Sequence, residues 1–224
     1  MNRSLSFRSL AALAVATAVT SVVCPAQAGT NGFVVPFFRG QPGSQVAGWD
    51  RFTVATDNGV GNSPDLAGSN ASAKLLQHDP NAFITSTGNI YNMAAQSTFD
   101  VHASSLAPVG LVVFQARSFG TELDYSTMKL SFGSTSLTAT RTELDRQLVG
   151  DPGTPGSGAF VSSLWQWDLS GQGVSAFTIS FGAAADSLSF DSATLDLAVV
   201  PEPAPMALLA AGMVGLLWIG GRRR

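Results

Sequence analysis

Between Gly29 and Val200 the sequence has almost no helical periodicity, and this absence limits that part of the chain to an all-β fold. Short runs rich in Val, Phe, Thr and Ser recur there between clusters of Gly, Pro, Asn and Asp. Runs of this length, bounded by turn-forming residues, are typical of strands. Alternation is clearest near residue 195, where Leu195, Leu197 and Val199 share one face of a predicted strand.

The runs predict about a dozen strands, which together indicate an antiparallel β-sandwich with a jelly-roll-like topology over residues 29–199. Hairpin turns are predicted at 132–135 and 182–186, a surface loop at 150–158 and a helical turn within 121–129. The expected strands are 33–38, 49–55, 73–76, 83–85, 97–103, 110–116, 128–132, 136–142, 159–167, 174–181, 188–191 and 194–199.

The first 28 residues have the pattern of a secretory signal peptide, which would form an N-terminal signal helix. Arg3 and Arg8 make the start positive, and residues 10–23 form an uncharged, mostly apolar run. Ala26 and Ala28 supply the small residues of a cleavage site, so the mature chain should begin at Gly29.

Residues 200–224 have three parts that differ sharply in chemistry. Pro201, Glu202 and Pro203 come first, then the uncharged stretch 204–221, then the arginines at 222–224. As a helix this stretch would be about 27 Å long, enough to cross a hydrocarbon core of about 30 Å with some thinning of the bilayer. Basic residues beside an apolar segment are preferentially retained in the cytoplasm. Both ends of the chain carry such residues, so the domain between them is expected to lie outside the inner membrane.

The order of Pro201-Glu202-Pro203, apolar helix and Arg222, Arg223 and Arg224 resembles the PEP-CTERM sorting signal, also called the ice-binding protein C-terminal domain. The resemblance covers residues 200–224 only. It implies a Gram-negative bacterium that makes exopolysaccharide, and processing near Pro-Glu-Pro by a membrane enzyme of the exosortase type. The protein would then pass from an inner-membrane-anchored intermediate, facing the periplasm, to the cell surface or the medium. The resemblance implies delivery and transfers no activity, ice binding included.

Charge and cysteine content narrow the function classes. Between residues 29 and 200 lie fourteen of the fifteen acidic residues but only seven of the twelve basic ones. So acidic a domain repels phosphates, and we exclude nucleic-acid binding.

Cys24, the single cysteine, lies in the signal segment, so disulfides and thiolate metal sites are not expected in the mature domain. A lipoprotein anchor at Cys24 is disfavoured because Val23 stands where a small residue is needed.

Trp165 and Trp167 are two residues apart, so both rings leave the same face of a strand. Exposed, the pair could stack on sugar rings as a glycan contact. Buried, it would fill the sandwich core, and Leu169 favours this second interpretation because it extends the apolar face.

The segment 57–65 is rich in oxygen ligands. Asp57, Asn58 and Asp65 could contribute to a structural calcium site, but the spacing departs from the EF-hand pattern. The same residue types are common in turns, and the turn interpretation is preferred. No other cofactor is expected.

No catalytic motif stands out in the sequence. His78 and His102 lie far from any partner with metal-ligand spacing, and Glu122 and Glu143 are the only glutamates before the tail. We therefore expect a non-enzymatic exported protein, associated with exopolysaccharide, whose processing partners are signal peptidase and an exosortase. The alternatives are a carbohydrate-binding module and, less favoured, a glycan hydrolase or lyase.

Overall fold

The computed structural model describes residues 27–28, 30–57, 59–151, 153–154 and 156–200 of the 224-residue chain. This part contains fourteen strands and one three-residue 3-10 turn, η1 (Thr30–Gly32). The first seven strands are β1 (Gln27–Ala28), β2 (Val34–Val35), β3 (Ser44–Trp49), β4 (Ser72–Gln77), β5 (Phe83–Ile84), β6 (Ile90–Asn92) and β7 (Thr98–Ser104). The others are β8 (Val109–Gly120), β9 (Leu123–Phe132), β10 (Thr135–Thr138), β11 (Thr142–Val149), β12 (Gly158–Asp168), β13 (Ala176–Ala183) and β14 (Leu188–Val199).

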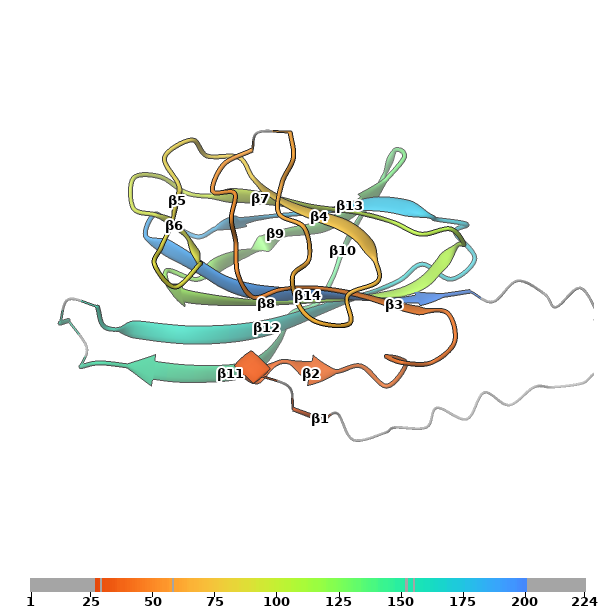
Figure 1. Ribbon diagram of the computed structural model, residues 1–224, viewed down its shortest axis with the longest axis horizontal. Helices are drawn as coiled ribbons and strands as arrows, with labels where there is room; N and C mark the ends of the chain where they lie inside the picture. Colours follow the sequence, from red (N-terminus) through yellow and green to blue (C-terminus); the bar gives the residue numbers. More distant parts are fainter. Residues whose placement is uncertain (1–26, 29, 58, 152, 155, 201–224) are drawn as a thin grey trace, which may run out of the picture.

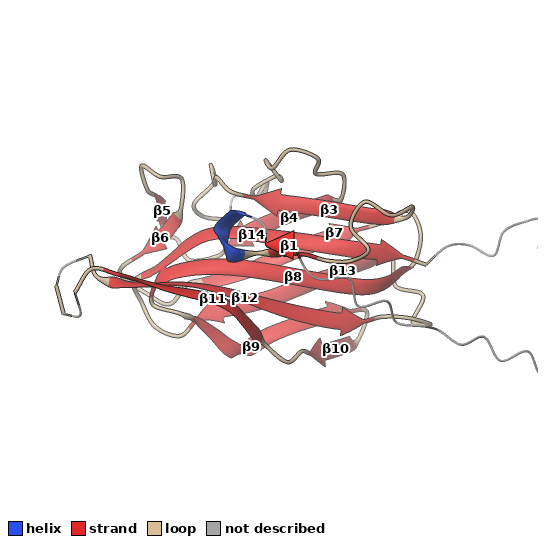
Figure 2. Cartoon of the chain, turned by 90° about the horizontal axis from the view of Figure 1, so that it is seen from below, coloured by secondary structure: helices blue, strands red, loops and turns tan. Residues whose placement is uncertain are grey.

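Two antiparallel sheets lie one above the other (Figure 1). The five-stranded sheet has the order β10-β9-β13-β7-β4. The seven-stranded sheet has the order β11-β12-β8-β14-β6-β5, and β3 also pairs with β14. Strands β1 and β2 form a separate short pair, next to η1 on the outer side of the larger sheet (Figure 2). The fold is therefore all-β and antiparallel, as the sequence predicts, and is consistent with a β-sandwich.

The hydrophobic core lies between the two sheets and is rich in aromatic rings. Phe190 of β14 lies 4.8 Å from Phe99 of β7, centroid to centroid, and Phe181 of β13 lies 5.1 Å from Phe99. Leu195 and Leu197 are also fully buried, which confirms the face predicted for them. Each sheet contributes alternate residues to this layer, because side chains along a strand point to opposite faces in turn.

The central strands of the larger sheet depart from simple alternation. Along β8 and β14 nearly every residue is buried, including Gln115, Thr194 and Asp196 on the face that points away from the core. The segment leading from η1 into β3 crosses this outer face and covers it. This sheet is therefore buried on both sides at its centre, although its outer layer is polar.

Most predicted strands are confirmed, and the Phe132–Thr135 hairpin turn joins β9 to β10 as expected. The predicted turn at 182–186 is not a hairpin, because it links β13 of one sheet to β14 of the other. The helical turn predicted within 121–129 is wrong, since most of that segment belongs to β9 and pairs with β13.

Several strand predictions differ from the structure in their bounds, and the strands predicted separately at 188–191 and 194–199 form the single strand β14. The strand predicted at 49–55 ends at Trp49 and begins earlier, at Ser44, although Trp49 and Phe52 are both buried. The run 136–142 is divided between β10 and β11, and β11 was not predicted because its residues are charged and exposed.

No helix among the described residues is long and apolar enough to span a membrane. The predicted apolar span at 204–221 and the signal segment up to residue 26 lie outside the described residues. Strand β14 ends at Val199, directly before the predicted sorting tail.

Candidate functional site

The outer face of the five-stranded sheet carries a polar row that crosses four neighbouring strands. Lys74 of β4 pairs with His102 of β7, His102 with Thr178 of β13, and Thr178 with Ser131 of β9. The next residues along each strand, among them Leu75, point into the core instead. Because register places the four polar residues directly opposite one another, their side chains share the outward face.

This row lies in a surface hollow of about 580 Å3. Its polar lining residues are Ser72, Lys74, His102, Ser104, Ser131 and Thr178. His102 Nδ1 lies 2.9 Å from the Thr178 hydroxyl, and Lys74 Nζ donates to Ser63 Oγ at 2.5 Å. The hollow thus combines one ammonium group, one imidazole and several hydroxyls on a rigid sheet.

Strand register places a second polar row beside the first. Asp100 of β7 pairs with Ser180 of β13, and Ser180 pairs with Lys129 of β9. His78, which follows β4, places Nε2 at 3.0 Å from Asp100 Oδ2 and Nδ1 at 3.3 Å from Asp57 Oδ2. Both lysines and both histidines of the chain therefore gather on or beside one sheet face.

His78 and His102 are isolated in the sequence, and their neighbours come from other strands that the sheet register brings beside them. Asp100 and His102 leave the same side of β7, and β4 brings Lys74 and the segment that carries His78 beside it. The alternation of residues 98–104 does indicate that Asp100 and His102 lie on the same face of one strand. The pairing of β4 with β7 had no signal in the sequence.

Glu122 and Glu143, the two glutamates that precede the tail, belong to a network between β11 and the segment at the start of β9. Arg146 contacts Glu122 at 2.7 Å and Glu143 at 2.9 Å, while Arg141 contacts Glu143 at 2.6 Å. The Arg141 guanidinium lies 3.7 Å from the centre of the Tyr125 ring, and the Tyr125 hydroxyl donates to Glu122.

This network keeps its acids ionised. Hydrogen bonds from Arg146 and then Arg141 lower the pKa of Glu143 to about 2, and Arg146 likewise lowers the pKa of Glu122. Burial, followed by the hydrogen bond to Glu122, raises the pKa of Tyr125 to about 12. Sugar hydrolysis by two carboxylates needs one that is protonated at working pH, so these glutamates suit a structural link better than catalysis.

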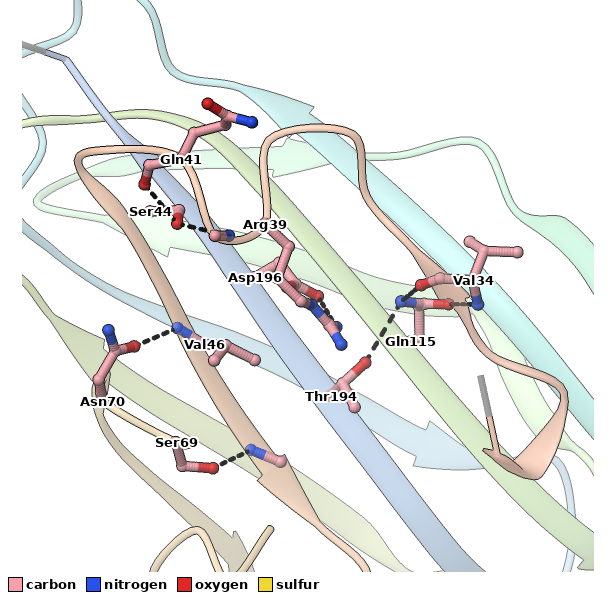
Figure 3. A network of polar contacts seen from close by, with 12 residues as sticks. Val34, Arg39, Gln41, Ser44, Val46, Ser69, Asn70, Gln115, Thr194 and Asp196 are labelled. Atoms are coloured by element: carbon pink, nitrogen blue, oxygen red, sulfur yellow. Dashed lines mark hydrogen bonds and ion pairs between the residues drawn. The ribbon is translucent and has the colours of Figure 1, made fainter. Parts of the chain in front are cut away.

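A second polar network lies on the outer face of the seven-stranded sheet (Figure 3). Arg39 binds the buried Asp196 carboxylate through two hydrogen bonds of 2.5 and 2.6 Å. Gln115 accepts from the backbone N–H of Val34 at 2.8 Å, and its amide donates to the Val34 carbonyl and to Thr194. The segment that leads from η1 into β3 therefore provides hydrogen-bond partners for Asp196 and Gln115, and these two side chains are not available to a ligand.

The core interpretation of Trp165 and Trp167, which Leu169 favoured, is confirmed, and the alternative glycan contact is wrong, because both rings belong to the core. Trp165 is fully buried and Trp167 is 3% exposed. The Trp167 Nε1–H donates to the Leu137 carbonyl at 3.2 Å. Their shared face points inward, so neither indole can lie flat on a sugar ring.

The residues considered for calcium have separate partners in the structure. Asp57 contacts His78, and Asp65 Oδ1 accepts from the backbone N–H of Asp50 at 2.9 Å. Asn58 lies outside the described residues. In the part of the chain that is described, no three or more His, Cys, Asp or Glu side chains form a group able to hold a metal.

The sorting and processing residues fall mostly outside the described ranges. These are Ala26, the motif Pro201, Glu202 and Pro203, and the arginines at 222–224. Ala28 is described and pairs with Val34 in the β1–β2 ladder. Comparisons with protein-family models, with curated proteins and with solved structures found no match for this chain.

Proposed function

We propose that this chain is a non-enzymatic protein of the cell surface or polysaccharide matrix, exported by its signal peptide and sorted by a PEP-CTERM tail. One observation carries the proposal: the described antiparallel strands end directly before the second of the two sorting patterns that the sequence predicts. The last strand stops at Val199, and Val200 still donates to the Pro108 carbonyl at 2.8 Å. The Pro-Glu-Pro motif follows directly in the sequence, so cleavage there would remove none of the described strands.

In this proposal the fold is a jelly-roll-like sandwich. Pairing of β3, the first long strand, with β14, the last one, supports this topology because it brings the two ends of the domain into one sheet. The protein passes through an inner-membrane-anchored intermediate that faces the periplasm, and an exosortase then releases or transfers it near Pro201.

Cutting at the motif is expected to change the mass of the protein recovered from envelope and medium. The mature wild-type form should begin at Gly29 and end near Val200, whereas Glu202→Ala should retain the chain up to Arg224. Intact-mass spectrometry of both fractions measures this. Pro205→Ala, in the same tail but outside the motif, is the matched control and should be processed normally. Recovery of wild-type protein that still ends at Arg224 would remove the sorting proposal.

Carbohydrate binding is the second candidate, and the hollow on the five-stranded sheet favours it. Its hydroxyls and basic groups are the donors that sugar oxygens require, and they lie on a rigid sheet. The binding surface differs from the one expected from sequence, since Trp165 and Trp167 take no part in it. An enzyme is not proposed, because Arg146 already binds both Glu122 and Glu143.

A further inference from the structure

We propose that the hollow on the outer face of the five-stranded sheet binds a strand of acidic polysaccharide, with Lys74 and His102 contacting its carboxylates. The inference rests on the proposed matrix role and adds to it a site and a ligand class. It depends on the chemistry of the lining, on the spacing of the strands and on the charge of the surrounding domain.

The lining supplies hydrogen-bond donors and no negative charge. Lys74 and His102 lie opposite each other on adjacent strands, and hydroxyls from Ser72, Ser104 and Thr178 surround them. None of the described residues that line the hollow is an aspartate or glutamate. A ligand rich in acceptors and carrying negative charge fits this set better than a neutral or cationic one.

The charge of the hollow contrasts with that of the domain. Between residues 29 and 200 there are twice as many acidic as basic side chains, so the general field repels polyanions. A polyanion would therefore bind only where basic groups are concentrated. Lys74 and Lys129 are the only two lysines of the chain, and both lie on this sheet face.

The geometry favours a chain that lies across the strands. Neighbouring strands are about 4.8 Å apart, which is close to the length of one pyranose unit in an extended polysaccharide. Strands β4, β7, β13 and β9 each present one polar residue of the row, so successive sugars would each meet one side chain. The row is ordered before binding, because His102 already contacts Thr178 at 2.9 Å.

Recognition at this site must rely on charge and hydrogen bonds. Phe177 is buried and Phe132 is partly buried against the core, so neither of the two aromatic rings that line the described part of the hollow is fully open for stacking on sugars. Binding should therefore weaken with added salt, since exposed charges are screened over about 10 Å at 0.1 M ionic strength.

The test uses the full chain purified in a mild detergent. Isothermal titration calorimetry would measure binding of alginate oligosaccharides, which are polyuronates, of dextran oligosaccharides of equal length, and of poly-glutamate. We expect alginate to bind in low salt, and Lys74→Ala and His102→Ala each to weaken it about tenfold. Arg51→Ala is the matched control, since Arg51 is an exposed basic residue that does not line the hollow, and it should change affinity by less than about twofold.

The other outcomes overturn the inference. Equal binding of dextran would show that charge is irrelevant, and equal binding of poly-glutamate would show that no sugar is recognised. Absence of alginate binding, or equal loss in Arg51→Ala and Lys74→Ala, would remove the hollow as the site. Thermal unfolding of each variant controls for folding. None of these results bears on cleavage at Pro201-Glu202-Pro203, so failure here is distinguishable from failure of the sorting proposal.

Discussion

Replacing Trp165 with alanine is expected to lower the free energy of unfolding by about 3–5 kcal/mol, as removal of a buried aromatic ring usually does. The ring is fully buried between the sheets, with Phe114 and Tyr125 each 6.2 Å away, centroid to centroid. Its loss leaves a cavity that a rigid sheet cannot collapse to fill. Urea unfolding followed by fluorescence of the remaining tryptophans measures the change.

Two further variants separate packing from other roles of Trp165. Trp165→Phe should be less destabilising than alanine, because it keeps most of the volume and removes an indole N–H that has no hydrogen-bond partner among the described residues. Phe37→Ala, at a ring that is 66% exposed, should change stability by less than about 0.5 kcal/mol. A folded Trp165→Ala protein of unchanged stability that had lost polysaccharide binding would contradict the core assignment.

Replacing Arg39 with alanine is expected to destabilise the protein by about 3 kcal/mol at pH 7, because it leaves an unpaired buried charge. The Asp196 side chain is 1% exposed and Arg39 is its ion-pair partner. The N-terminal segment that crosses the larger sheet would also lose an anchor to β14 (Figure 3). Urea unfolding at constant ionic strength measures the loss.

The destabilisation of Arg39→Ala should depend on pH in a defined direction. Burial raises the pKa of Asp196, and the hydrogen bond and charge of Arg39 oppose that rise. Without Arg39 the folded-state pKa should rise further above the unfolded value of about 3.9. A carboxyl whose pKa is raised in the folded state disfavours folding when it is ionised. The destabilisation caused by Arg39→Ala is therefore greatest above the folded-state pKa of Asp196, and it becomes smaller as the pH falls from that pKa toward 3.9.

Measurement at pH 7 and at pH 4.5 tests this sign, with two controls. Arg39→Ala combined with Asp196→Asn removes the buried charge, so it should regain part of the stability and lose the added pH dependence. Arg51→Ala, at an exposed arginine, should stay within about 0.5 kcal/mol of wild type. An equal loss in Arg39→Ala at both pH values would mean that Asp196 is not the group that titrates.

The sequence predicted strands well where one face was apolar and the other polar. Segments such as 97–103 and 194–199 alternate clearly, and burial of one face is a local property of side-chain order. The sequence did not predict β11, which lies at the edge of its sheet. This strand has no apolar face, and its residues include the charged Glu143, Asp145 and Arg146. The sequence prediction also failed at 182–186, where a turn between sheets has the same composition as a hairpin turn.

The candidate site was less predictable than the fold. Lys74, His102, Thr178 and Ser131 come from four segments spread over about half the chain, and only their register makes them a row. The pair Trp165 and Trp167 was the most conspicuous feature for a ligand, yet the sheet turns that face inward. Spacing within one strand predicts only that two side chains share a face, and it was the apolar neighbour Leu169 that favoured burial of this face.

The sequence alone therefore determined the all-β character of residues 29–200, because strand periodicity and turn formers are local. It also predicts the sorting patterns at both ends, because charge order and apolar length can be read directly from the chain. Only the tertiary structure decided which strands are neighbours, that the Asp196 carboxylate is buried beneath Arg39, and that Lys74 and His102 share a hollow. Those features depend on contacts between residues far apart in the chain, and strand pairing across such separations leaves no local trace in the sequence.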